Sequence, residues 1–226
     1  MEMSKIEVGS IQNTTYSGWF FEHEFIPLNR TEKFLKRLLD LFVAITALLI
    51  LAPLLLLVAA AVKITIGSPV LFIQDRGGLS GNVFKIVKFR SMRSLEYGPE
   101  ITQVTKNDPR ISRVGSFIRR TSIDELPQLW NVITGDMSIV GPRPHALAHD
   151  IHFSKVIPRY ALRHYAKPGI TGLAQIRGYR GETSELEDMI KRVEADLEYL
   201  KNWSLWGDIL IIFKTTIALF KQTNAL

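Results

Sequence analysis

The sequence predicts a mostly helical α/β protein in which one kinked helix enters a membrane and a second domain lies against it. Three observations support this fold class. An uncharged apolar stretch of 22 residues runs from Leu41 to Val62, two short segments after it resemble strands, and amphipathic helical patterns follow. We divide the chain into an N-terminal arm at residues 1–30, a membrane helix at 31–66, and a domain at 67–226 with a small β element and interfacial helices.

The composition narrows the class of partner. The 226 residues include 28 basic and 22 acidic side chains, and the net charge of +6 suits phosphorylated substrates or an anionic membrane surface. The same charge would suit nucleic-acid binding. A long apolar stretch is not expected in a nucleic-acid-binding protein, however, so we expect no nucleic-acid partner. The chain has no cysteine, which excludes disulfides and thiolate metal sites.

The apolar stretch is long enough to span a bilayer, yet two features favour a helix that leaves by the face it entered. Pro53 lies within the stretch, where proline removes a backbone hydrogen bond and kinks a helix. Basic residues flank both ends, so the positive-inside rule gives no single orientation. They are Lys33, Lys36 and Arg37 before the stretch and Lys63, Arg76, Lys85 and Lys88 after it. A buried helix of a soluble protein is the alternative.

Two strands and two helices are expected next. Ser68–Gly78 reads as a short strand that runs into a glycine turn, and Gly81–Met92 alternates apolar and polar residues. Ile111–Arg120 has a helical pattern with arginines outside its apolar face, and Leu126–Ile133 is the expected second helix. The apolar face of the first helix consists of Val114, Phe117 and Ile118.

The last third of the chain predicts a turn and two further helices. Lys167–Gly172 has proline and then glycine at the central positions of a type II turn. Glu185–Lys201 is a charged amphipathic helix. Trp203–Phe220 is apolar but too short and too charged to span a membrane, so we expect it at the interface with Trp203 and Trp206 as anchors.

Residues that suit phosphate chemistry gather in one stretch. Two adjacent carboxylates follow a basic pair, and an arginine between two prolines comes later; the residues are Arg119, Arg120, Asp124, Glu125, Pro142, Arg143 and Pro144. A carboxylate can attack phosphorus or hold Mg²⁺, and arginine neutralises phosphoryl oxygens by bidentate contacts. Ser122 with Glu125 also fits a helix capping box, in which Asp124 would only complement the helix dipole. Spacing alone leaves both interpretations open.

These runs, Arg119–Val132 and Gly135–Pro144, resemble the signature of the bacterial sugar transferases, the polyprenyl-phosphate hexose-1-phosphate transferases. Further matches are Gln74-x-Arg76, Lys88–Met92 and Pro168–Gly172, followed by Leu173–Gly178. The resemblance implies a monotopic membrane enzyme with the re-entrant helix inferred above. This family is expected to have serine before the helix proline, where this chain has Ala52, and that puts the stabilisation of the kink in question.

The resemblance also implies a reaction at the cytoplasmic face of the bacterial inner membrane. Asp124 would attack the sugar-linked phosphate of a UDP-hexose and expel UMP, and undecaprenyl phosphate would then displace Asp124. Glu125 would hold Mg²⁺, alone or with Asp124. Arg143, oriented by Pro142 and Pro144, would neutralise the phosphoryl charge, with Arg119 as a second candidate. The expected product begins exopolysaccharide, capsule or O-antigen assembly.

Other polar residues have two interpretations each. Lys88 and Arg90 are expected at the substrate or the membrane, or on a solvated strand face, and Arg177 and Arg180 are expected at a phosphate or in water. His145, His149 and His152 have the spacing of one helical face, which would suit a metal or a sugar-nucleotide pocket.

Two other function classes are weighed, a glycosyltransferase that releases UDP and a non-catalytic membrane adaptor. The hexose, glucose or galactose, and assembly into a homo-oligomer stay open.

Overall fold

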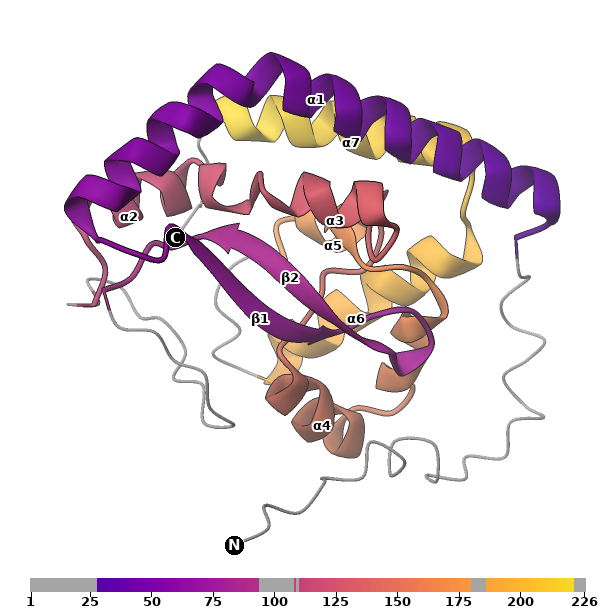
Figure 1. Ribbon diagram of the computed structural model, residues 1–226. Coiled ribbons are helices and arrows are strands. Elements are labelled where there is room, and N and C mark those ends of the chain that lie inside the picture. Colours follow the sequence, from indigo (N-terminus) through magenta and orange to yellow (C-terminus); the bar gives the residue numbers. More distant parts are fainter. Residues whose placement is uncertain (1–27, 94–107, 109, 180–185, 222–226) are drawn as a thin grey trace, which may run out of the picture.

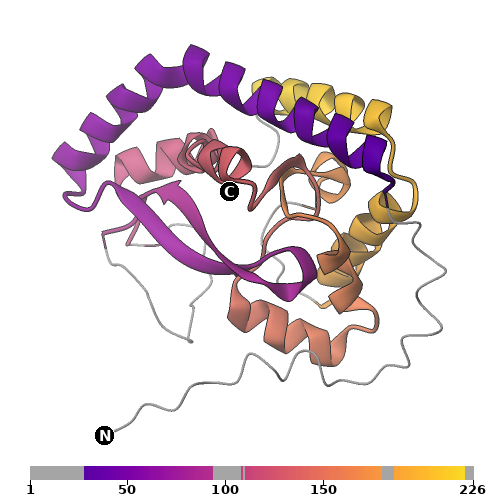
Figure 2. The same ribbon diagram turned by 45° about the vertical axis from the view of Figure 1, so that its right-hand side comes forward.

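The computed structural model describes residues 28–93, 108, 110–179 and 186–221, and its mostly helical α/β architecture agrees with the predicted class. Helix α1 (Arg30–Thr65) arches over one side of the molecule, and helix α7 (Leu205–Lys221) runs alongside it (Figures 1 and 2). Beneath them lie two small sheets and shorter helices. The predictions for the N-terminal arm and for Arg180 fall outside the described residues.

Helix α1 is continuous over 36 residues and contains Pro53. It begins at a capping box in which Asn29 accepts from the Glu32 backbone at 2.9 Å and Glu32 accepts from the Asn29 backbone at 2.8 Å. Figure 1 shows the helix bending about half-way along its length, as a proline within a helix predicts. The proline therefore bends α1 without dividing it into two helices.

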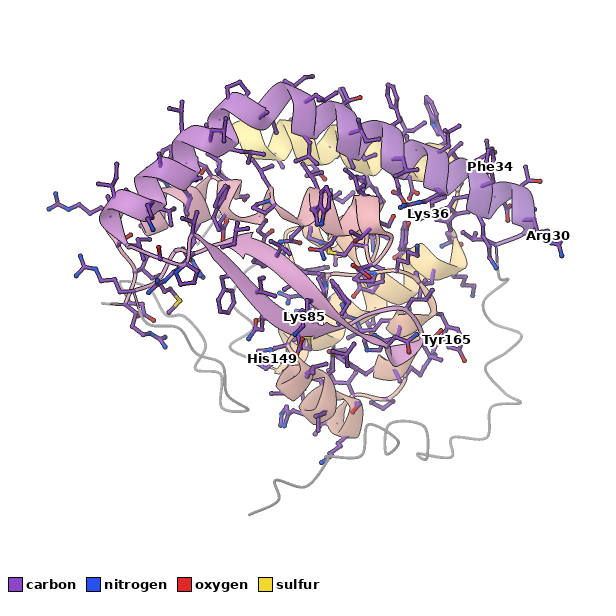
Figure 3. The ribbon with its side chains drawn as sticks, viewed as in Figure 1. Arg30, Phe34, Lys36, Lys85, His149 and Tyr165 are labelled. Carbon is purple, nitrogen blue, oxygen red and sulfur yellow. The ribbon has the colours of Figure 1, made fainter. Side chains whose placement is uncertain are left out.

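The outer face of α1 is apolar and exposed. Among the described residues it is the one helix long and apolar enough to cross a membrane, and only 11% of its most apolar window is buried. Its exposed large residues are Phe34, Leu35, Leu38, Phe42, Ile45, Leu49, Ile50, Leu54, Leu56, Leu57 and Ile64. Figure 3 shows Phe34 pointing away from the domain and Lys36 pointing towards it. A soluble protein would bury such a face, so α1 is suited to lipid.

The first turns of α1 bind the domain through polar side chains. Lys36 donates to Asp208 at 2.7 Å and to the Val140 carbonyl oxygen at 3.0 Å. Arg37 donates to the carbonyl oxygens of Val132 and Ile133, at 2.6 and 2.8 Å, near the end of helix α3 (Gln128–Thr134). Two of the basic residues that flank the apolar stretch thus hold the helix on the domain.

The end of α1 is held by apolar packing. Val58 and Val62 are buried against Phe89 and Ile118, which belong to the hairpin and to helix α2 (Arg113–Arg120). Both ends of α1 therefore contact the same domain.

The predicted pair of strands forms an antiparallel hairpin of β1 (Leu71–Gly77) and β2 (Val83–Phe89), joined through the short helix η3 (Leu79–Gly81). The register pairs the first residue of β1 with the last residue of β2. Asn131 of α3 holds the open edge of β2, because its side chain accepts from the Val87 backbone at 3.0 Å and donates to the Lys85 carbonyl at 2.7 Å. This contact fixes β2 against the helix that follows the acidic pair.

A second sheet was not predicted. Strands β3 (Ser138–Val140) and β4 (Gly169–Thr171) pair in parallel, so the type II turn expected at Lys167–Gly172 is wrong. Gly169 does not have the positive φ which that turn requires. Glycine is needed here because an added Cβ would lie 2.1 Å from the Gly141 backbone nitrogen.

The remaining elements are short helices around these sheets. They are η4 (Ile123–Glu125), α4 (Leu147–Val156), η5 (Tyr160–Tyr165), α5 (Leu173–Ile176) and α6 (Leu186–Lys201). The largest core cluster lies between α1, α3, both sheets and α7. A second cluster packs α6 against η5.

One helix start and one side-chain prediction were wrong. Ser112 caps α2, which therefore begins two residues later than expected; on its apolar face Ile118 is buried and Phe117 is half exposed. Trp206 is exposed as an interfacial anchor would be, but Trp203 turns inward and donates to Asp208 at 3.1 Å.

Candidate active site

The two adjacent carboxylates, Asp124 and Glu125, lie on η4, a single helical turn before α3. We had expected the helix that became α3 to carry them. Ser122 precedes them in the left-handed region at φ 60°, a conformation that costs energy for a residue other than glycine. Its side chain makes no capping hydrogen bond, and its Oγ is buried without a partner. The capping-box interpretation is therefore wrong. The carboxylates of Asp124 and Glu125 are both buried in the domain.

Glu125 is buried and paired with two cations. Lys88 donates to its Oε1 at 3.0 Å, and Arg143 donates to Oε1 at 2.5 Å and to Oε2 at 3.2 Å. These cations come from β2 and from the loop after β3, so the fold brings together residues 37 and 18 positions away from Glu125. Burial lowers the pKa of Lys88, whereas the charge of Glu125 raises the pKa of Arg143.

Asp124 is buried next to this cluster but is not paired in the same way. None of the described residues donates a hydrogen bond to it, and its exposed fraction is 8%. Burial first, and then the charge of Glu125, raise its pKa from 3.8 to about 6, although Lys88, Arg119 and Arg143 act in the opposite direction. Asp124 is thus a carboxylate with available oxygens among cations, which is what a nucleophile for phosphorus requires.

The backbone of Arg143, the arginine between the two prolines, is held by a second arginine, Arg163. Arg163 is buried and donates to the Arg143 carbonyl oxygen at 2.7 Å, while Asp196 of α6 accepts from Arg163 at 2.7 and 3.1 Å. Prolines restrict the backbone on either side of Arg143. A small pocket opens beside it, lined by Gly77, Pro142, Arg143, Pro144, His145, Arg163, His164, Ala166 and Pro168.

Arg76 is a residue near the site that sequence reasoning did not assign to it. It lies one residue before the end of β1, next to the loop that carries Arg143, and burial, followed by the charge of Arg143, lowers its pKa to about 10. Its position in the Gln74-x-Arg76 pattern was the signal in the sequence. The side chain of Gln74 accepts from Arg76 at 2.6 Å.

Three further basic residues were predicted to bind phosphate or substrate, and the structure brings one of them near the acidic pair. Arg119 is half-buried at the end of α2, where its charge lowers the pKa of Asp124. Arg90 is buried away from this cluster and donates to the backbone carbonyls of Ser68, Met92 and Arg93, so in this structure it holds the chain in place.

Arg177 is also outside the cluster. Its side chain forms a partly exposed, bidentate pair with Glu198 of α6, at 2.5 and 2.6 Å. Arg177 is exposed, so of the two interpretations given above the structure favours the one in which it faces water, with Glu198 as its partner.

The three histidines do not form a metal site. Helix α4 begins at Leu147, so His145 precedes it and is buried, and its Nδ1 lies 2.6 Å from the Tyr160 hydroxyl. His149 and His152 pack beside Phe153 instead, with ring centroids 6.0 and 5.0 Å from it. The described ranges contain no group of three or more His, Asp or Glu side chains that would hold a metal ion.

Comparison with known proteins identifies a family and several relatives. A family model described as bacterial sugar transferase matches residues 31–222. A UDP-glucose:undecaprenyl-phosphate glucose-1-phosphate transferase of Escherichia coli K12 is 53% identical over 88% of this chain and 43% of its own length. A protein of the same name from Caulobacter vibrioides is 51% identical over 84% of this chain and 71% of its own length.

A third relative, the exopolysaccharide production protein PSS of Rhizobium leguminosarum, is 47% identical over 81% of this chain and 94% of its own length. The chain spans about two fifths of the length of several relatives, the Escherichia coli protein among them. The family model nevertheless covers the whole candidate site, from Lys88 to Arg143. The chain therefore belongs to the bacterial sugar transferase family.

Proposed function

We propose that this protein transfers a hexose 1-phosphate from a UDP-sugar to undecaprenyl phosphate and releases UMP. The names of the Escherichia coli and Caulobacter relatives support glucose 1-phosphate as the first candidate, and galactose 1-phosphate is the second. One observation carries the proposal. Asp124 is a buried carboxylate without a hydrogen-bond donor among the described residues, and it adjoins a glutamate that already has Lys88 and Arg143 as partners.

In the first half of the reaction a carboxylate oxygen of Asp124 attacks the sugar-linked phosphorus. A phosphorus–oxygen bond forms, and the bond from this phosphorus to the bridging oxygen breaks, so that its electron pair leaves on UMP. Arg143 and Lys88 are the cations available to the phosphoryl oxygens as their charge is redistributed. Glu125 orients both cations, because each donates to its carboxylate.

In the second half the phosphate oxygen of the lipid carrier attacks the same phosphorus and displaces Asp124. The carboxylate leaves with its electron pair, and the product is polyprenyl diphosphate hexose. Burial of Asp124 limits the approach of water, which would otherwise hydrolyse the phosphosugar intermediate.

Magnesium fits the residues at this point. Mg²⁺ in phosphate-transfer sites is usually held by one or two carboxylates together with substrate phosphates and water. The oxygens of Asp124 receive no hydrogen bond from the described chain, and Glu125 lies next to it. Glu125, with Asp124, would hold the ion when the diphosphate is bound. The ion would supply neutralisation of the diphosphate charge.

The arrangement of α1 supports a re-entrant, monotopic attachment. Its start is held on the domain by Lys36 and Arg37, and its end by Val58 and Val62. A helix that crossed the bilayer would place its ends on opposite sides, and a single domain would not contact both. The apolar outer face between these contacts would lie in one leaflet, with α7 beside it at the interface.

This attachment suits the two substrates. The UDP-sugar is soluble, whereas the lipid carrier presents its phosphate at the level of the lipid headgroups. We place the domain on the cytoplasmic face of the bacterial inner membrane, where both substrates meet. We propose that this transfer is the first membrane step of glycan assembly, and the name of the Rhizobium relative supports a role in exopolysaccharide production.

The proposal is tested by UMP release from the purified protein in nanodiscs with undecaprenyl phosphate and a panel of UDP-sugars. We expect UMP with one hexose and a loss of at least about a thousandfold in Asp124→Asn, because the neighbouring carboxylate, Glu125, is held by Lys88 and Arg143. Lys85→Gln, an exposed charge on the same hairpin, is the matched control and should retain activity. Release of UDP would make the protein a glycosyltransferase, and no nucleotide release would favour the adaptor.

A further inference from the structure

Arg76 lies where the hairpin meets the loop that carries Arg143. Its backbone pairs with Phe84 in the hairpin and forms an isolated antiparallel bridge with Ala146, which follows Pro142–His145 in the chain. The next residue, Gly77, lines the small pocket beside Arg143. The fold therefore fixes the position of Arg76 relative to Arg143 through backbone hydrogen bonds.

The guanidinium of Arg76 is held in place but lacks an anion. Nη2 donates to Gln74, whereas Nε is buried without a hydrogen-bond partner. Arg76 forms no ion pair with any carboxylate in the described part of the chain, in contrast to Arg143 with Glu125 and Arg163 with Asp196.

The charges around Arg76 favour binding of an anion. The positive charge of Arg143 repels the Arg76 guanidinium. The carboxylates of Asp150 and Glu125 attract the guanidinium, but neither forms a hydrogen bond with its Nε. Arg76 is partly buried and its Nε is buried without a partner, which is costly, and a phosphate placed between the two arginines would reduce that cost. Arginine is also suited to phosphate because its planar fork can donate two parallel hydrogen bonds.

We propose that Arg76 binds the nucleoside-linked phosphate of the donor, the phosphate next to the one that Asp124 attacks. The inference rests on the proposed function, in which Arg143 and Asp124 take the sugar-linked phosphate. The two phosphates share one bridging oxygen, so the second must lie immediately beside the first. Arg76 lies beside Arg143 and forms no ion pair with the described carboxylates.

This position gives Arg76 a role in bond cleavage. When Asp124 bonds to the sugar-linked phosphorus, the bond from that phosphorus to the bridging oxygen breaks. The electron pair stays on the oxygen, which becomes a terminal oxygen of UMP and gains negative charge. A guanidinium next to this oxygen stabilises the leaving group without giving up a proton.

The test compares binding of UMP and of uridine, which lacks the phosphate, to the full chain in nanodiscs by calorimetry. Arg76→Gln should weaken UMP binding by at least about tenfold and leave uridine binding unchanged. Arg76→Lys keeps the positive charge but loses the planar guanidinium that can donate two parallel hydrogen bonds. Its affinity for UMP should therefore lie between those of Arg76→Gln and the parent protein. Lys85→Gln removes an exposed charge of the same hairpin (Figure 3), paired with Asp75 at 3.1 Å, and should match the parent protein.

Stability separates a binding role from a structural one. Because Arg76 is a partly buried cation that forms no ion pair with the described carboxylates, Arg76→Gln should melt at the same temperature as the ligand-free parent protein, or higher. A lower melting temperature in both Arg76 variants, together with weaker uridine binding, would mean that Arg76 only holds the hairpin, and would overturn the inference.

Two other results would also overturn it. UMP binding that is equal in Arg76→Gln and the parent protein, or absent from the parent protein, excludes the assigned phosphate. A raised KM for undecaprenyl phosphate with unchanged UMP binding would assign Arg76 to the lipid phosphate instead. These measurements are of binding, so they are independent of the turnover assay: a parent protein that binds UMP but releases none refutes the proposed function alone.

Discussion

Asp124 and Glu125 are adjacent in the chain, and we predict that neutralising them changes the stability of the protein in opposite directions. Burial and the charge of Glu125 raise the pKa of Asp124 from 3.8 to about 6. The folded protein therefore holds the Asp124 proton more tightly than the unfolded chain does, so ionisation of this carboxyl lowers the free energy of unfolding. Asp124→Asn removes the charge and keeps the shape of the side chain.

The magnitude follows from the two pKa values. The difference between 3.8 and about 6 corresponds to about 3 kcal/mol. This cost is fully present above the folded-state pKa and is relieved as the pH falls towards the unfolded-state value. We expect Asp124→Asn to exceed the parent protein in stability by about 3 kcal/mol near pH 7.5 and by about half as much near pH 5. At the higher pH this is roughly 6–12 °C in melting temperature for a chain of this size.

Glu125→Gln should have the opposite effect. Glu125 is the anion for Lys88 and Arg143, whose side chains are only 19% and 21% exposed. Removal of its charge leaves two largely buried cations without their partner, which costs on the order of 3–5 kcal/mol. Arg143, whose pKa Glu125 raises further, is a cation at both pH values, so this loss should persist at the lower pH.

The assay is thermal unfolding of both variants and the parent protein in nanodiscs, followed by tryptophan fluorescence in a buffer with a metal chelator. Activity would not separate the variants, because we expect both to lose UMP release. The reasoning is refuted if Asp124→Asn melts at or below the temperature of the parent protein near pH 7.5. It is also refuted if the advantage of Asp124→Asn does not shrink near pH 5.

Three further predictions concern the metal, the membrane helix and its attachment. Chelation of divalent ions should abolish UMP release, and added Mg²⁺ should restore it; full activity in the chelator would exclude the metal. The chain has no cysteine, so single Arg30→Cys and Thr65→Cys variants report on each end of α1. A membrane-impermeant maleimide should label both from the cytoplasmic side, whereas labelling from opposite sides would mean a spanning helix. Lys36→Met should cost about 3–5 kcal/mol in thermal unfolding because it leaves Asp208 buried without a cation, and the loss should be largely recovered in Lys36→Met/Asp208→Leu.

Local patterns in the sequence were enough to predict the elements that depend on neighbouring residues. The apolar run predicted α1, and the alternation in Gly81–Met92 predicted β2. The parallel pairing of β3 with β4 could not be predicted in the same way, because it joins segments about thirty residues apart and each strand has three residues. A proline–glycine pair therefore looked like a turn when it was the start of a strand.

The acidic pair shows where spacing stops being informative. Ser122 and Glu125 have the spacing of a capping box, but Lys88 and Arg143 compete for the same carboxylate and offer two charges instead of one backbone amide. That competition depends on how β2 and the loop after β3 are placed in three dimensions. The family resemblance indicated Asp124 and Glu125 as the candidate site, and only the fold shows which cations reach Glu125.

Isolated basic residues were the least predictable part of the site. Arg90 and Arg177 were both candidates for phosphate, yet Arg90 binds backbone carbonyls and Arg177 pairs with Glu198. Arg76 belongs to the same category in the sequence and lies beside Arg143 in the structure. An arginine carries the same charge in all three environments, so its role follows from which groups remain near it without a partner.

The membrane helix and the site are linked through neighbouring residues of one strand. Lys88 of β2 binds Glu125, and the next residue, Phe89, packs against Val58 and Val62 of α1. Successive side chains of a strand point to opposite faces, so β2 contacts the site on one side and the membrane helix on the other. A change in the depth of α1 in the membrane would therefore move Lys88 and the acidic pair with it. This connection would hold the site at a fixed height above the lipid headgroups, where a phosphate on a lipid carrier can reach it.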